Sequence, residues 1–218
     1  MSDPYWNHNV HYQPLILDLI PDGCKRALDV GCGDGLLVRK LAARIPVVTG
    51  ADRSAEMIGL AQAESRHLHN VTFVEADYLD DAHGLLSEGR YDLVIAVSVV
   101  HHADFGRALE GLARLLTPGG RMIVVGLGKN RSAVDWIAGG VAQVVSRIVR
   151  RPHGGKRGPH GMPAMDPIMS WGQTAREARA ILTGCRWRRL LLRRYLLVWD
   201  KPWHLPSERS LRQEGSRR

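Results

Sequence analysis

Three glycines and two carboxylates stand close together in the segment DVGCGDG, which runs from Asp29 to Gly35. Gly31, Gly33 and Gly35 allow a left-handed backbone and leave no β-carbon between the loop and a ligand lying on it. The Asp29 carboxylate, two residues before Gly31, suits an ammonium or sulfonium group better than a phosphate. The segment therefore predicts a site for a small cofactor that carries positive charge.

A strand and a helix must position this loop. The apolar residues before Gly31 predict a short buried strand, and Leu36, Leu37, Leu41 and Ile45 recur at helical spacing after it. A loop of this kind lies outside the carboxyl end of a parallel sheet, where open α/β folds bind ligands. A dinucleotide site requires a third glycine where Leu36 stands, so an NAD-dependent oxidoreductase is the weaker interpretation.

DVGCGDG behind an apolar strand resembles the first motif of the class I S-adenosylmethionine-dependent methyltransferases, and LLTPGGRMIVVG, from Leu115 to Gly126, is similar to a later structural motif of that family. The resemblance covers residues 27–128 and, loosely, the C-terminal strands. It implies S-adenosylmethionine as the cofactor. The expected fold is α/β, a seven-stranded, mostly parallel, doubly wound sheet that ends in an antiparallel strand pair. TPGG is expected to end a helix that reaches about Leu116, and the fifth strand is expected to begin at Arg121.

Asp52 ends the predicted second strand, VVTGAD. A carboxylate at that position can accept two hydrogen bonds from a ribose diol. The alternative is a helix cap, which Ser54 is better placed to provide. Arg53 either stacks along the adenine or faces solvent.

The resemblance implies that Asp77, after the third strand VTFVEA, binds the adenine amino group. It also implies that the backbone N–H of Tyr78 reaches an adenine ring nitrogen. Cys32, Ser98 and Tyr12 complete the expected cofactor-binding set. Cys32 is interpreted as a small residue facing the strand or the cofactor rather than as a nucleophile.

A nearly continuous apolar run from Tyr91 to Val100 predicts a central strand that leads into His101 and His102. Either histidine can serve as a general base at the carboxyl end of that strand, or can be a structural residue there. The order of preference for proton transfer is His102, His101 and then His11. No metal site is predicted, because His8 and His11 lack a third nearby ligand.

The length of 218 residues predicts one methyltransferase domain over residues 1–202. Residues 1–22 form an aromatic strap, which serves either as a lid over the cofactor or as a cover for a sheet edge. The apolar segment from Leu15 to Ile20 within it can form a helix. Residues 129–170 form a variable region with an amphipathic helix from Ser132 to Arg150 and a basic loop at 151–167. Ser170 and Gln173 predict a capping box that begins a further helix, and residues 203–218 are expected to be disordered.

The charge is uneven along the chain. Residues 1–128 carry 11 basic and 16 acidic side chains, whereas residues 129–218 carry 19 and 6. A basic final third indicates either an anionic partner such as nucleic acid or the codon bias of a GC-rich genome. The sequence lacks a run of about 18 apolar residues and a signal peptide, so we expect a cytoplasmic protein that does not bind membranes.

These patterns predict an enzyme that transfers a methyl group in line from S-adenosylmethionine to a small-molecule acceptor. The absence of an NPPY-type tetrapeptide, at the position that reads SVVHH, argues against N-methylation of adenine or glutamine. One alternative is a nucleic-acid methyltransferase, as the basic final third suggests. The other is a protein that binds S-adenosylmethionine or S-adenosylhomocysteine without transferring methyl groups. The sequence does not indicate the oligomeric state.

Overall fold

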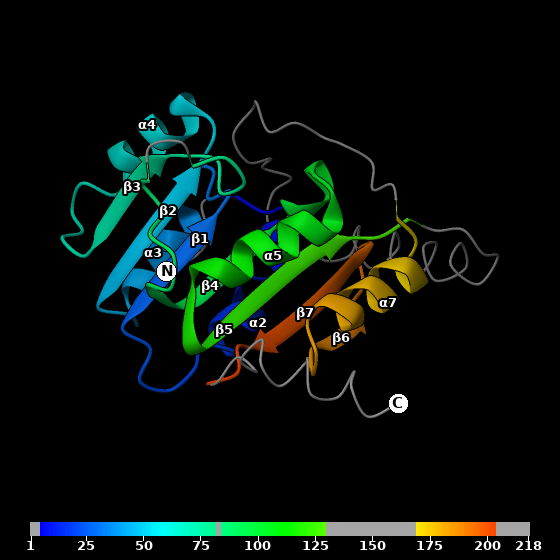
Figure 1. The fold of residues 1–218 in the computed structure, drawn as a ribbon. Helices are drawn as coiled ribbons and strands as arrows, with labels where there is room; N and C mark the ends of the chain where they lie inside the picture. The colour runs from blue at the N-terminus through cyan, green and yellow to red at the C-terminus, as the bar shows by residue number, and fades with distance from the viewer. Residues whose placement is uncertain (1–4, 82–83, 130–168, 204–218) are drawn as a thin grey trace, which may run out of the picture.

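The computed structural model of the protein describes residues 5–81, 84–129 and 169–203. Within these residues, seven strands form one sheet in the order β3-β2-β1-β4-β5-β7-β6 (Figure 1). The strands are β1 (Arg26–Val30), β2 (Val47–Asp52), β3 (Val71–Glu75), β4 (Tyr91–Val97), β5 (Leu116–Leu127), β6 (Arg186–Arg189) and β7 (Arg194–Asp200). The first five are parallel, and β7 runs antiparallel to both β5 and β6. The predicted fold class is confirmed.

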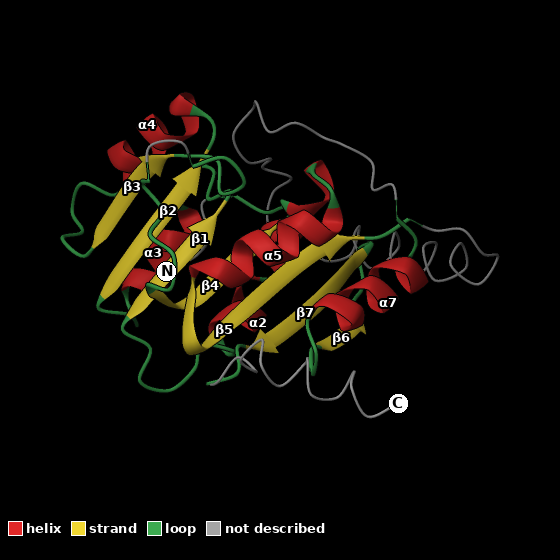
Figure 2. Ribbon diagram, viewed as in Figure 1, coloured by secondary structure: helices red, strands yellow, loops and turns green. Residues whose placement is uncertain are grey.

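Helices cover both faces of this sheet (Figure 2). They are α1 (His8–His11), α2 (Gln13–Leu17), α3 (Leu36–Ala42), α4 (Ala55–Glu64), α5 (Phe105–Leu115) and α7 (Trp171–Ile181), with a 3-10 turn η1 (Val100–His102). One buried cluster joins α5 and α7 to the sheet, and a second joins α2, α3 and α4 to the opposite face. This double cover explains why the residues of β4 are almost all apolar, since both of its faces are buried.

The glycine loop connects β1 to α3. Gly31, Gly33 and Gly35 all have positive φ, at 69°, 54° and 75°. A β-carbon on Gly31 would also collide with Cγ2 of Val99. The loop conformation therefore requires the glycines that the sequence supplies.

Two strand boundaries differ from the prediction. β4 ends at Val97, because Ser98 takes a left-handed φ of 59° and the chain turns into η1. β5 begins at Leu116 and includes the TPGG segment, which was expected to end α5 before a strand beginning at Arg121. The backbones of Gly119 and Gly120 hydrogen-bond to Lys201, so this segment continues the pairing with the C-terminal strand.

The N-terminal segment packs over the face of the central strands. Trp6, Tyr12 and Ile16 are buried in the cluster that contains residues of β4 and β5. The helices there also begin earlier than the apolar segment from Leu15 to Ile20 suggested, because the Asn7 side chain caps α1 and Pro14 lies in the first turn of α2. The segment thus covers a sheet face rather than a sheet edge.

The C-terminal elements agree with the sequence. Ser170 and Gln173 form the predicted capping box of α7, and β6 and β7 form the predicted antiparallel pair. The expected helix at 132–150, the basic loop at 151–167 and most of the tail at 203–218 lie outside the described residues. In the described part of the chain, no helix is long and apolar enough to cross a membrane.

Candidate functional site

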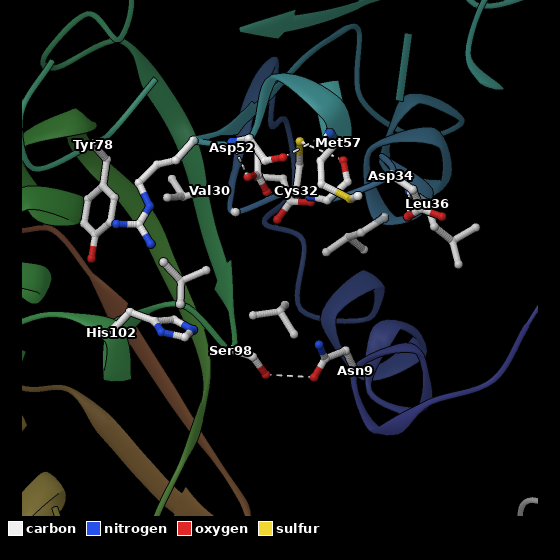
Figure 3. Close-up of a pocket in the computed structure, with 18 of the residues that line it drawn as sticks. Asn9, Val30, Cys32, Asp34, Leu36, Asp52, Met57, Tyr78, Ser98 and His102 are labelled. Atoms are coloured by element: carbon white, nitrogen blue, oxygen red, sulfur yellow. Dashed lines mark hydrogen bonds between the residues drawn. The ribbon is translucent and has the colours of Figure 1, made fainter. Parts of the chain in front are cut away.

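A cavity of about 570 Å³ lies at the carboxyl ends of the parallel strands. Its walls come from the ends of β1 to β5, from the start of β7 and from the N-terminal segment, which contributes Tyr5, Asn9 and Gln13. The volume is in the range of roughly 300 to 1,000 Å³ that is usual for small-molecule sites. Figure 3 shows Asp34 and Asp52 on one side of this cavity and His102 on the other.

Asp52 is held in place by two backbone donors. Its Oδ2 accepts a hydrogen bond from the Gly33 N–H at 2.9 Å, and its Oδ1 accepts one from the Ser54 N–H at 3.0 Å. Ser54 itself caps α4 through the Met57 N–H, as predicted. The Asp52 carboxylate is therefore fixed at the rim of the glycine loop, and each oxygen retains a lone pair for a ligand.

Asp29, Asp34 and Asp52 together form what we call the acidic side of the cavity. Asp29 is only 3% exposed. Its pKa is raised to about 8, mainly by burial and additionally by the neighbouring carboxylates of Asp52 and Asp34. A cationic ligand would favour the ionised carboxylate, whereas a phosphate would add repulsion.

Cys32 lies in the same loop but has the properties of an unreactive thiol. Its side chain is buried, and its Sγ donates a weak hydrogen bond to the Gly33 carbonyl at 3.7 Å. Burial and the nearby Asp29 carboxylate both raise the pKa of the thiol. These contacts fit a small packing residue rather than a nucleophile.

Two hydrogen-bonded ties attach the N-terminal segment to the cavity walls. The Tyr5 hydroxyl donates to both carboxylate oxygens of Asp34 at 3.0 Å. Asn9 Oδ1 accepts hydrogen bonds from the Ser98 hydroxyl at 2.7 Å and from an Arg194 guanidinium nitrogen at 2.9 Å. The segment thus closes over the glycine loop and over the ends of β4 and β7.

Near the end of β3, Asp77 and Arg53 form an ion pair that is more exposed than the residues of the acidic side. Asp77 accepts a hydrogen bond from the Leu79 N–H at 2.9 Å and lies 3.8 Å from the Arg53 guanidinium. Arg53 is largely exposed, with 62% of its side chain accessible. The adjacent Tyr78 buries its hydroxyl in the cavity wall, where burial raises its pKa to about 12.

His101, His102 and Arg194 form what we call the basic side of the cavity. The two imidazole rings lie 4.1 Å apart between centroids. The pKa of His101 is lowered to about 4, mainly by burial and additionally by the neighbouring His102 and Arg194. His102 is more accessible, and burial together with Arg53 lowers its pKa below the ordinary value of 6.5. Both imidazoles are therefore neutral at pH 7 and able to accept a proton.

The cavity brings together most of the residues that the sequence singled out. Those that line it are Asp29, Gly31, Cys32, Gly33, Asp52, Arg53, Asp77, Tyr78, Ser98, His101 and His102. Gly35, His11 and Tyr12 do not line it. Gly35 caps α3, His11 packs against Trp6, and Tyr12 is a core residue whose hydroxyl donates to the Leu191 carbonyl.

Several lining residues were missed by the sequence analysis. Asp34 stands inside the glycine motif and could have been included on that ground. Tyr5 belongs to the aromatic strap that was expected near the cofactor. Asn9, Gln13 and Arg194 carry no local signal, because the tie between Asn9 and Arg194 spans 185 positions of the chain.

The fit of the site to S-adenosylmethionine depends on its buried polar atoms that lack a partner among the described residues. Gln13 Oε1, Tyr78 Oη, His101 Nδ1 and Arg194 Nε line the cavity and have no hydrogen-bond partner within the described structure. Buried polar atoms of this kind normally pair with a ligand or water. Together with the acidic side, they fit a ligand that has both a cationic group and several polar groups. No group of three or more potential metal ligands occurs in the described ranges.

Comparisons with known proteins agree with this geometry. A family model for a methyltransferase domain matches residues 27–120. An uncharacterized methyltransferase of Mycobacterium tuberculosis is 35% identical over 211 residues, which cover 92% of this chain and 99% of the relative. A ubiquinone biosynthesis O-methyltransferase of Aeromonas salmonicida is 28% identical over 169 residues, which cover 72% of this chain and 71% of the relative.

Solved structures support the fold. The [4+2]-cyclase SpnF superposes with a TM-score of 0.66 at 19% identity, covering 92% of this chain and 87% of that one. An S-adenosylmethionine-dependent methyltransferase from Aquifex aeolicus gives a TM-score of 0.57 at 17% identity, covering 86% and 88%. Because the Mycobacterium relative matches nearly end to end and the family model spans the glycine loop to β5, this chain belongs to the class I S-adenosylmethionine-dependent methyltransferases.

Proposed function

We propose that this protein binds S-adenosylmethionine and transfers its methyl group to a small-molecule acceptor. One observation carries the proposal: a single cavity joins the glycine loop and the fixed Asp52 carboxylate to two neutral histidines. Cofactor recognition and proton acceptance are therefore available within the same enclosed volume.

In this proposal, the residues at the strand ends bind different parts of the cofactor. Asp52 would hold the ribose hydroxyls, because its oxygens are already oriented by two N–H donors. Asp77 and Tyr78, at the end of β3, would contact the adenine. Asp29 and the glycine loop would face the cationic amino-acid end, where a buried carboxyl can offset positive charge.

When bound, the cofactor supplies a methyl group on a positively charged sulfur, so the leaving group is a neutral thioether. The protein then has to orient the acceptor and exclude water. The N-terminal segment serves both purposes through the Tyr5–Asp34 and Asn9–Ser98 hydrogen bonds. If the acceptor must lose a proton, His102 is the preferred base, since His101 is the more deeply buried of the two histidines.

The size of the cavity favours a small acceptor. Its volume of about 570 Å³ must be shared by the cofactor and the acceptor, and the N-terminal segment covers part of it. The relatives from Aeromonas and other bacteria that are named for ubiquinone biosynthesis are consistent with a small-molecule class. A nucleic-acid acceptor is the alternative. More than half of the basic residues that suggested it lie outside the described ranges.

A second candidate function is ligand binding without methyl transfer. The similarity in fold to the [4+2]-cyclase SpnF supports this second candidate, because the same fold also occurs in a protein named for different chemistry. The residues of the acidic side would bind the cofactor in either case. Methyl transfer must therefore be measured separately from cofactor binding.

The test is a calorimetric titration of the protein with S-adenosylmethionine, S-adenosylhomocysteine and NADH. We expect micromolar binding of the first two and none of NADH. Transfer of a labelled methyl group to a panel of small acceptors then separates an enzyme from a binding protein. Binding of NADH without S-adenosylmethionine would overturn the proposal, and cofactor binding without transfer to any acceptor would favour the second candidate.

A further inference from the structure

Arg194 is a buried cation whose charge no carboxylate in the described structure balances. It is the first residue of β7, and it pairs across the sheet with Leu127 at the carboxyl end of β5. Only 8% of its surface is exposed. Arginine is rarely buried without an anionic partner, because removing its charge from water is costly.

The contacts of Arg194 leave much of its hydrogen-bonding capacity unused. One terminal nitrogen donates to Asn9 Oδ1 at 2.9 Å, which is a neutral acceptor. Its Nε is buried and has no hydrogen-bond partner among the described residues. The side chain also lines the cavity, so the unused donors belong to a group that a ligand can reach.

The charged and titratable groups around Arg194 do not compensate it. Its electrostatic neighbours are Tyr12, whose pKa is raised to about 12 mainly by burial, together with Arg193 and His101. None of these is an anion at pH 7. The carboxylates of the cavity are those of the acidic side, on β1, β2 and the glycine loop, and that of Asp77 after β3. No ion pair joins any of them to Arg194 in the described structure.

We propose that Arg194 binds a carboxylate of the methyl acceptor, so that the substrate class is small organic acids. The proposal rests on the proposed function, since it requires an acceptor in the same cavity. A guanidinium offers paired donors that match the two oxygens of a carboxylate. An acid held there lies beside His101 and His102, the two candidates for accepting a proton. Val97, Val99 and Leu127 supply apolar surface for its body.

A carboxylate could also come from the amino-acid end of the cofactor. The position of Arg194 favours the acceptor, because β7 lies beyond β4 and β5 from the glycine loop in the strand order. The residues proposed to hold the cofactor come from β1, β2 and β3, on the other side of β4. An experiment can separate the two sources by measuring cofactor affinity and acid affinity independently.

The experiment titrates the protein with two acids, benzoate and hexanoate, and with their uncharged amides. Each titration is run on the free protein and on protein saturated with S-adenosylhomocysteine. The variants are Arg194→Gln and Arg194→Lys, with Arg188→Gln as the matched control, because Arg188 is an exposed arginine on the adjacent strand β6.

We expect both acids to bind wild-type protein about tenfold or more tightly than their amides, as charged hydrogen bonds allow. Arg194→Gln should abolish this preference, Arg194→Lys should keep part of it, and Arg188→Gln should leave it unchanged. Affinity for S-adenosylhomocysteine should change by less than about twofold in all three, because the proposed cofactor contacts remain.

Equal binding of acids and amides by wild-type protein would overturn the inference. So would a loss of S-adenosylhomocysteine affinity in Arg194→Gln with no acid preference, which would assign the carboxylate to the cofactor. If wild-type protein binds no S-adenosylhomocysteine, the proposed function fails, and the titrations on free protein then show separately whether Arg194 recognises acids.

A second variant covers the case in which Arg194→Gln fails to fold. Asn9→Asp keeps an oxygen at the position that accepts from Ser98 and Arg194, but it supplies an internal carboxylate to the guanidinium. Acid preference should be lost in this variant while thermal unfolding stays close to wild type. Retention of the full acid preference in Asn9→Asp would contradict the proposal.

Discussion

The acidic and basic sides of the cavity differ in how the chain builds them. Asp29, Asp34 and Asp52 come from one stretch of 24 residues, in which two neighbouring strands and a glycine loop fix their positions. On the basic side, the adjacent His101 and His102 meet Arg194 only through tertiary packing, because Arg194 lies more than 90 positions further along the chain. Local sequence therefore determines the side proposed for the cofactor, whereas the side proposed for the acceptor depends on the whole fold.

The largest expected effect is on the rate of methyl transfer, which depends on the basic side of the cavity, while cofactor affinity depends on the acidic side. His102→Gln should lower methyl transfer about 100-fold or more for an acceptor that must lose a proton, because a general base is removed. Affinity for S-adenosylhomocysteine should stay within about twofold, since the acidic side is untouched. The measurements are kcat and cofactor affinity, with His69→Gln as an exposed control.

The pH dependence of the methyl-transfer rate also tests the role of His102. Burial and Arg53 lower the pKa of His102 below its ordinary value of 6.5. The neutral imidazole is the proton acceptor, so the rate should be level above about pH 6.5 and should fall as the pH drops through the lowered pKa. A rate in His102→Gln equal to wild type across this range would remove His102 from proton transfer.

The next effect concerns affinity on the acidic side. Asp52→Ala should weaken S-adenosylhomocysteine binding by about 1 to 3 kcal/mol, or roughly 5- to 150-fold, because hydrogen bonds to a charged acceptor are lost. Calorimetric titration measures it, and Glu64→Ala on the exposed side of α4 is the control. If Asp52→Ala binds as tightly as wild type, the ribose must lie elsewhere.

A smaller effect is expected from the protonation of Asp29. Its pKa of about 8 means that the carboxyl is protonated in the free protein at pH 7. A cationic ligand lowers this pKa, so S-adenosylmethionine binding at pH 7 should release up to one proton, and affinity should rise as the pH approaches 8. Calorimetry in buffers of different ionisation enthalpy counts the proton. Asp29→Asn should release none.

The pH dependence of the stability of the free protein also tests the raised pKa of Asp29. The pKa of Asp29 in the folded protein lies above its ordinary value of 3.8, so between about pH 4 and 8 the folded state binds more protons than the unfolded state. The free energy of unfolding contributed by Asp29 is therefore fully present below pH 4 and is lost as the pH rises towards 8. Thermal unfolding of Asp29→Asn should lack this decline, and an identical decline would contradict the assignment.

Much of the fold could be predicted because its signals are local. Apolar runs indicated β1 to β4, the glycine loop marked the first crossover, and Ser170 with Gln173 marked the start of α7. The end of β4 could not be predicted, because Ser98 adopts a left-handed conformation that its residue type does not favour. The start of β5 was missed because Gly119 and Gly120 are normally turn residues, and only their pairing with Lys201 keeps them in the sheet.

The residues of the candidate site also differ in whether local sequence identifies them. Asp52 and the glycines were identifiable because their spacing along the chain fixes their spacing in the sheet. Arg194 was not, since the sequence RRYLLVW indicates a strand but not which arginine is buried. Tyr12 was included in the expected cofactor-binding set because an aromatic residue in the strap can face either the ligand or the core. In the structure Tyr12 faces the core and does not line the cavity.

The smallest expected effect tests how the strap supports the acidic side. Tyr5→Phe removes the hydroxyl that donates to Asp34 and keeps the ring, so S-adenosylhomocysteine affinity should fall by about 1 kcal/mol, or roughly fivefold. Asp34→Asn and the double variant complete a cycle, measured by calorimetry. The two effects should not add, because both substitutions remove the same contact. Additive losses would mean that Tyr5 and Asp34 act on the ligand independently, and the strap would then bind the cofactor directly instead of supporting the loop that does.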